Sequence, residues 1–190
     1  MNKRIYLLLI VIITINSFIS CKKENTNMAN KCNNDTLFFD NFENMQISKN
    51  KWIFEDLAEI ATEDTINHYL SVSSFTQRNM GHSYYESGNA YSLITGIESD
   101  KLIFKLSYKA FVNSDDGPTV FKLIQVKKDT VCEIINISEH VAGKWKNYQI
   151  SGTIFNLRKE DTLRMVIVNM AGYNNGSYES GFDDILITKK

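Results

Sequence analysis

Apolar and polar residues alternate along most of the chain after residue 35, and residues 101–112 show the pattern most clearly. The apolar positions there are Leu102, Phe104, Leu106, Tyr108, Ala110 and Val112. The intervening positions include Lys101, Lys105, Ser107 and Lys109. A period of two predicts a β-strand with one face in a core. The turn-forming sequence at 113–118 and the apolar segment Thr119–Lys127 predict a second strand that runs back along the first.

Similar short segments recur up to the C-terminus. The further predicted strands are Leu37–Phe42, Tyr69–Phe75, Ala90–Ile94, Thr130–Ile137, Lys146–Phe155, Leu163–Met170 and Phe182–Thr188. The one helix that the pattern favours is short, Phe54–Thr62. Many short strands separated by turns are typical of an antiparallel all-β fold, either a two-sheet β-sandwich or a barrel.

The N-terminus has the three parts of a secretory signal. Lys3 and Arg4 precede an apolar segment, 5–15, and small or polar residues follow it up to Ser20. The apolar segment is well short of the ~20 residues that a membrane-spanning helix needs. We therefore predict a cleaved signal peptide over residues 1–20.

Cys21 follows this segment directly. The sequence Phe18-Ile19-Ser20-Cys21 resembles the lipobox of bacterial lipoproteins, although Phe18 stands where leucine is usual. The resemblance implies that Cys21 carries lipid chains such as palmitate, which contribute roughly 0.8 kcal/mol per buried CH₂ to membrane binding. The charged residues at 22–24 resemble a surface-export tag, which implies an outer-membrane or cell-surface location. The alternative is an ordinary signal peptide followed by a chance cysteine.

Residues 21–35 are mostly polar and predict a flexible tether, because they offer too little apolar surface to offset chain entropy. Residues 36–190 are enough for a single domain with its own core. The formal net charge is −1 at pH 7, with lysines and acids interspersed. This distribution argues against a nucleic-acid partner, which requires a clustered basic face.

Two cysteines remain if Cys21 is acylated. Cys32 and Cys132 could form a disulfide in an oxidising compartment, or Cys132 could be a buried free thiol of a strand. Neither shows the paired spacing of a metal site.

Four segments together resemble jelly-roll carbohydrate-binding modules and MAM-type domains. They are Phe39-Asp40-Asn41-Phe42-Glu43 followed by Trp52, Ser87-Gly88-Asn89-Ala90-Tyr91-Ser92-Leu93, Trp145-Lys146-Asn147-Tyr148, and Gly181-Phe182-Asp183-Asp184-Ile185-Leu186-Ile187. They occur in the family's order and span nearly the whole domain. The resemblance implies a galactose-binding-like jelly roll in which the first and last strands are neighbours, and in which Trp52 and Trp145 pack structurally.

Asp183 raises the question of a cation. A period of two places Asp183 on the same side as Ile185 and Ile187, and an inward carboxylate is costly unless it is paired, hydrogen-bonded or bound to a cation. Asp40 and Glu43 on the first strand could add oxygen ligands, which suit Ca²⁺. The resemblance implies a structural Ca²⁺ at the same place. The alternative is that Asp183 accepts backbone N–H groups.

Aromatic side chains on loops are the best candidates for a ligand site, because sugar sites combine ring faces with a few polar groups. These candidates are Tyr84, Tyr85, Tyr173 and Tyr178. The alternative is that each is an ordinary surface or half-buried tyrosine.

No set of residues in the sequence predicts catalysis. The acids at 55–64 fit the solvated face of the expected helix, and no nucleophile elbow or histidine-rich metal motif is present. The sequence favours a membrane-anchored, non-catalytic lipoprotein that binds carbohydrate. Two alternatives remain, a structural or protein-binding (adhesin-like) surface lipoprotein and a small glycoside-active enzyme.

Overall fold

The computed structural model describes residues 35–63, 66–79, 82–113, 119–128, 130–138, 140–170, 172 and 174–190. Cys21, Cys32 and Tyr173 lie outside these residues, as do the predicted signal peptide and nearly all of the predicted tether. The unit Asp35–Lys190 carries its own internal contacts. None of the helices in the described part of the chain is long and apolar enough to cross a membrane.

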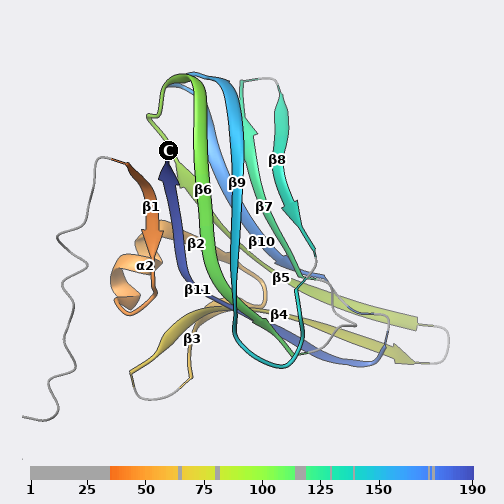
Figure 1. Cartoon of the computed structure of the whole chain (residues 1–190). Helices are drawn as coiled ribbons and strands as arrows, with labels where there is room; N and C mark the ends of the chain where they lie inside the picture. The colour runs from red at the N-terminus through yellow and green to blue at the C-terminus, as the bar shows by residue number, and fades with distance from the viewer. Residues whose placement is uncertain are drawn as a thin grey trace, which may run out of the picture. The chain divides into compact units, whose positions relative to one another are not determined.

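The antiparallel strands of the described residues are hydrogen-bonded into one continuous sheet that folds over into two layers, sheet A and sheet B, as expected for a two-sheet sandwich (Figure 1). Sheet A has the order β3 (Ala58–Thr62), β4 (His68–Asn79), β11 (Gly176–Lys189), β6 (Ser99–Val112), β9 (Lys146–Leu157). Sheet B has the order β2 (Trp52–Glu55), β5 (His82–Ile94), β10 (Thr162–Asn169), β7 (Thr119–Val126), β8 (Val131–Ile137). The remaining strand, β1 (Thr36–Asp40), pairs with the second half of β11. The two segments predicted to be neighbouring first and last strands are therefore neighbours.

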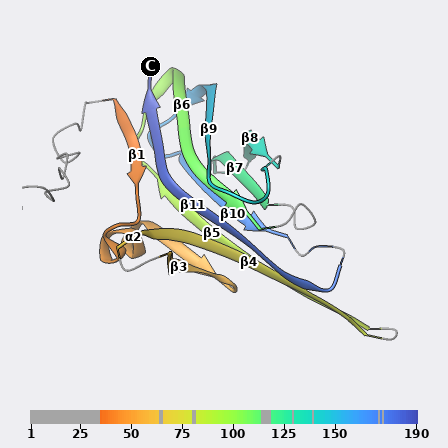
Figure 2. The same ribbon diagram turned by 60° about the horizontal axis from the view of Figure 1, so that its bottom comes forward.

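Strand β5 belongs to both sheets. Its residues 82–87 pair with β4, and its residues 88–94 pair with β10. The strand changes sheets at Gly88, where an added Cβ would lie 2.6 Å from the carbonyl oxygens of Leu57 and Ser73. The paired ends of β4 and β5 form a long hairpin that extends away from the rest of the domain (Figure 2).

The core lies between the sheets and confirms the alternation in the sequence. The even-numbered apolar residues of β6 from Leu102 to Val112 are all buried. Tyr108 stacks on Phe121 of sheet B with ring centroids 4.8 Å apart. The opposite positions of β6 face away from the core, and we call that side of sheet A the outer face.

The predicted helix at Phe54–Thr62 is wrong. The segment forms β2 and β3, separated by a turn in which Asp56 has φ +53°. The helix of the described residues is α2 (Met45–Lys51), and the Asn44 side chain caps it by accepting a hydrogen bond from Ile47 N at 3.1 Å. Strand partners on β4 and β5 outweigh the helix propensity of residues 54–62.

Candidate functional site

Three aromatic side chains meet on the outer face of sheet A. Tyr69 comes from β4, Phe111 from β6, and Trp145 lies directly before β9. The three rings pack edge to face, with centroids 4.8–5.7 Å apart. We call these residues the aromatic cluster. Tyr69 is buried while Phe111 and Trp145 are half-buried, so the cluster forms part of the surface.

Gly181 of β11 makes room for the cluster. It pairs with Ser71 on one side and Phe111 on the other. An added Cβ would lie 2.2 Å from Phe111 Cε1 and 2.9 Å from Tyr69 Cδ2. The two rings therefore lie down over the glycine, a position that any other residue would obstruct.

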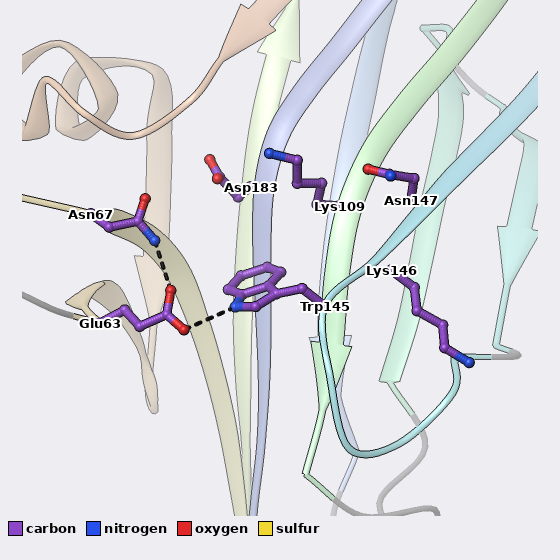
Figure 3. Close-up of a pocket in the computed structure, with 7 residues that line it drawn as sticks. All are labelled: Glu63, Asn67, Lys109, Trp145, Lys146, Asn147 and Asp183. Atoms are coloured by element: carbon purple, nitrogen blue, oxygen red, sulfur yellow. Dashed lines mark hydrogen bonds between the residues drawn. The ribbon is translucent and has the colours of Figure 1, made fainter. Parts of the chain in front are cut away.

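Two hollows lie beside Trp145. One has a volume of about 370 Å³, and the polar residues at its walls include Asn67, Lys109, Asn147 and Asp183 (Figure 3). The other has a volume of about 290 Å³ and is lined by Tyr69 and Phe111 together with Trp145. A ring bordered by polar groups on an open surface is the composition that sugar recognition requires.

Hydrogen bonds hold the rings in place. Trp145 Nε1 donates to Glu63 Oε1 at 3.3 Å, and Asn67 Nδ2 donates to Glu63 Oε2 at 2.7 Å (Figure 3). Tyr69 Oη donates to Glu179 Oε1 at 3.0 Å. Burial, followed by the hydrogen bond to Glu179, raises the pKa of Tyr69 to about 12, so its hydroxyl stays a donor at physiological pH.

The loop that presents Trp145 is tied to the core through His140. His140 Nδ1 lies 3.0 Å from the carbonyl oxygen of Thr119, and Nε2 lies 3.1 Å from Tyr108 Oη. Since a carbonyl only accepts, Nδ1 carries the proton and Nε2 accepts from the tyrosine. Burial lowers the pKa of His140, which keeps this neutral form in the folded protein. Gly143 N completes the attachment by donating to Val112 O at 2.9 Å.

The predicted side for Asp183 is wrong. Asp183 pairs with Lys109, whereas Leu186 pairs with Ser107, so β11 contains one extra residue between them. This bulge, with Asp184 at φ +48°, reverses the alternation and places Asp183 on the outer face. Asp183 is nevertheless buried, and burial followed by the nearby Asp184 charge raises the pKa of its carboxyl to about 6.

The three predicted calcium ligands do not form one set. Asp40 Oδ1 accepts from Phe42 N and Ser48 Oγ, and Oδ2 accepts from Trp52 Nε1 at 3.1 Å. Asp40 is therefore a structural acceptor, and the cation proposal narrows to Glu43 and Asp183. Within the described residues, no three His, Cys, Asp or Glu side chains group as a metal site. Ca²⁺ takes six to eight oxygens, so two carboxylates would need carbonyl and water ligands beside them.

The predicted ligand tyrosines are not gathered on one surface. Tyr178 is a buried strand residue rather than a loop residue, and its hydroxyl donates to Asn174 O at 2.8 Å. Tyr84 and Tyr85 are exposed on the hairpin, but as successive strand residues they point to opposite faces. Tyr173 lies outside the described residues.

The two tryptophans differ in role. Trp52 packs in the core, as predicted, at 2% exposure. The same prediction is wrong for Trp145, which borders both hollows. The alternation in the sequence indicates the outer position of Trp145. The even-numbered residues Tyr148 to Ile154 of β9 face the core, so the odd-numbered Trp145 is expected on the opposite face. Phe111 carries the same signal on β6.

Cys132 is exposed on β8, so the predicted buried thiol is wrong. Its pairing with Cys32 stays untested, because Cys32 lies outside the described residues.

No family model matches the sequence, and no curated protein matches it. Solved structures do match its fold. The CBM22-1 xylan-binding domain of Paenibacillus barcinonensis Xyn10C is 14% identical over 82% of this chain and 94% of that domain, with a TM-score of 0.51. The CBM22-1–GH10 modules of a Clostridium thermocellum endo-1,4-β-D-xylanase, complexed with xylohexaose, are 18% identical with a TM-score of 0.50.

This chain matches 82% of its own length but spans only 28% of that xylanase chain. An arabinose-bound α-L-arabinofuranosidase also matches, at 12% identity and a TM-score of 0.50, over 26% of its length. The residues 35–190 thus have the jelly-roll β-sandwich fold of carbohydrate-binding modules, as the sequence predicted.

Proposed function

We propose that this protein binds carbohydrate without cleaving it, at the aromatic cluster on the outer face of sheet A. The observation that carries the proposal is Trp145, which borders an open hollow walled by Asn67, Asn147 and Asp183. Amide and carboxylate groups can fix sugar hydroxyls while the indole stacks on a ring. The xylan-binding domain of similar fold supports a glycan as the partner.

Within the described residues, two carboxylates of this face use one oxygen each in hydrogen bonds, so the other oxygen can accept from a sugar hydroxyl. Glu179 uses Oε1 for Tyr69 and Ser71, and Asp183 uses Oδ1 for Asp184 N. Glu179 and Asp183 stand four residues apart on one strand, about 13 Å. Glycoside hydrolysis needs two carboxyls about 5–9.5 Å apart. The spacing of these two residues along the strand exceeds the carboxyl separation of a hydrolytic pair, and we assign both to holding sugar hydroxyls.

The N-terminal sequence supports the place of action. We propose that Cys21 is lipidated and that the domain is displayed at the outer membrane or the cell surface on the tether 21–35. Labelling with a palmitate analogue tests this, and the Cys21→Ala variant should lose both the label and the membrane fraction. A label that persists in the variant would contradict the anchor.

Isothermal titration with the segment 35–190 against soluble xylan, glucan, mannan and arabinan tests carbohydrate binding. The segment is suitable because it carries its own core. We expect measurable binding to at least one of these glycans and its loss in Trp145→Ala. Phe155→Ala, which removes an exposed ring from the far end of β9, should bind normally. No binding to any glycan, together with a stoichiometric protein partner from membranes, would favour the protein-binding alternative.

A further inference from the structure

The outer face of sheet A continues along β4 beyond the aromatic cluster. Gln77 of β4 pairs with Tyr84 of β5, and Phe75 pairs with Glu86. Cross-strand partners lie on the same face, and Phe75 shares its face with Tyr69 because both are odd-numbered residues of β4. The aromatic cluster and the exposed Tyr84 of the hairpin therefore belong to one surface.

Phe75 and Tyr84 form a second aromatic site on this surface, which we call the hairpin pair. They are diagonal neighbours across β4 and β5, a spacing within reach for aromatic side chains. Tyr84 is 54% exposed, and its hydroxyl donates to Glu86 Oε1. The pair thus offers an exposed ring beside a carboxylate, whereas in the cluster the half-buried ring of Trp145 lies beside Glu63.

Mostly small residues separate the two aromatic sites. Ser71 and Ser73 lie between Tyr69 and Phe75 on β4, and their partners on β11 are Gly181 and Glu179. Glu179 is the one large side chain among these four positions, and its Oε1 accepts hydrogen bonds from Tyr69 and Ser71. From Tyr69 to Gln77 the distance along the strand is eight residues, or about 26 Å.

Among the described residues, the charged side chains of this surface between the two aromatic sites are acidic. Glu179 lies on it between the two sites, and Glu86 lies at the hairpin pair. The lysines that line the two hollows, Lys109, Lys144 and Lys146, lie at the Trp145 end of the surface, and Lys109 is paired with Asp184. The carboxylates can accept hydrogen bonds from neutral sugar hydroxyls, whereas they would repel a polyuronate.

We propose that the hairpin pair is a second sugar subsite, and that the protein binds an internal stretch of a linear, uncharged polysaccharide along β4 from the aromatic cluster to Tyr84. The inference rests on the proposed function, since it extends the same surface. In this proposal the projecting hairpin favours long glycans over short ones, because only a long chain reaches Tyr84. Tyr85, on the opposite face of the hairpin, takes no part.

Titration with oligosaccharides of two lengths tests the inference. The probes are xylohexaose and xylobiose, the corresponding β-1,4-gluco- and manno-oligosaccharides, and a hexamer of galacturonate. We expect the protein to bind one neutral hexamer more tightly than the corresponding dimer. Titration with the galacturonate hexamer should give no more signal than titration with buffer alone. Tyr84→Ala should weaken the hexamer roughly fivefold and leave the dimer unchanged, because only the long chain reaches the hairpin.

Tyr85→Ala is the matched control, with a similar exposure of 50% on the same hairpin. It should change neither affinity. An unchanged hexamer affinity in Tyr84→Ala, an equal loss for hexamer and dimer, or tighter binding of galacturonate overturns the inference while the proposed function stands. Failure of the unaltered protein to bind every hexamer overturns both.

Discussion

Gly181→Ala is the most direct perturbation of the aromatic cluster. The new methyl group would lie 2.2 Å from Phe111 Cε1, where ordinary contacts begin at 3.4 Å, so the ring must move by about 1.2 Å. Phe111 contacts both Tyr69 and Trp145, and the methyl group would also lie 2.9 Å from Tyr69 Cδ2, so up to three edge-to-face pairs are disturbed. Each such pair contributes about 0.5–1.5 kcal/mol. The rings are at the surface and can swing outward, so we expect a loss of about 2 kcal/mol in the free energy of unfolding.

The assay compares stability with glycan affinity. A loss of about 2 kcal/mol lowers the Tm of a domain of this size by roughly 4–8 °C, measured by thermal unfolding. Glycan affinity, measured well below that temperature, should fall at least tenfold because Trp145 loses its support. Gly152→Ala is the control, since its methyl group would meet Phe104 at 2.6 Å on the core face of the same sheet. It should lower stability by overpacking, about 1–3 kcal/mol, and leave affinity unchanged.

Affinity retained in Gly181→Ala would refute the reasoning. So would an equal loss of affinity in both variants at the same fraction of folded protein. Either result would mean that the ordered rings are a structural feature of sheet A and not part of a binding surface.

Three further predictions concern the support of the fold. Burial lowers the pKa of His140, so as the pH falls below about 6.5 the unfolded chain takes up a proton at this residue before the folded protein does. The free energy of unfolding, measured by urea titration, should therefore decrease as the pH falls. The decrease should be smaller in His140→Gln. Asp40→Ala should cost about 3 kcal/mol or more in urea unfolding, because three donors lose a buried acceptor; a loss below 1 kcal/mol would contradict the role given to Asp40. Ca²⁺ should raise the Tm of EDTA-treated protein, because a free Ca²⁺ concentration of 100 times Kd adds about 2.7 kcal/mol to the free energy of unfolding. The double substitution Glu43→Gln and Asp183→Asn should abolish this rise in Tm. An unchanged Tm in the unaltered protein would end the calcium proposal.

The strands of this domain were predictable because the pattern reports burial directly. Residues 102–112 alternate without a break, and the structure buries the side that the pattern assigns. The neighbouring first and last strands followed from the resemblance, and their register confirms it. Local sequence was enough wherever a strand stays regular.

The site was harder to predict, because it depends on departures from regularity. A single extra residue at Asp184 reverses the side of Asp183, and no period-two count can detect it. The expected helix fails for a different reason, since residues 54–62 become strands only when β4 and β5 are present to pair with them. Tyr178 was misplaced because its neighbours 174–177 have a turn composition although β11 begins at Gly176.

The contrasting environments of the only two tryptophans give the protein two built-in fluorescence reporters. Trp52 is enclosed by Phe38 and Phe42, so its emission should change only when the chain unfolds. Trp145 is half-buried and borders the two open hollows, so acrylamide should quench it first. A glycan that shields Trp145 from acrylamide would therefore reduce the quenching of Trp145, and the enclosed Trp52 would serve as the reference signal in the same molecule.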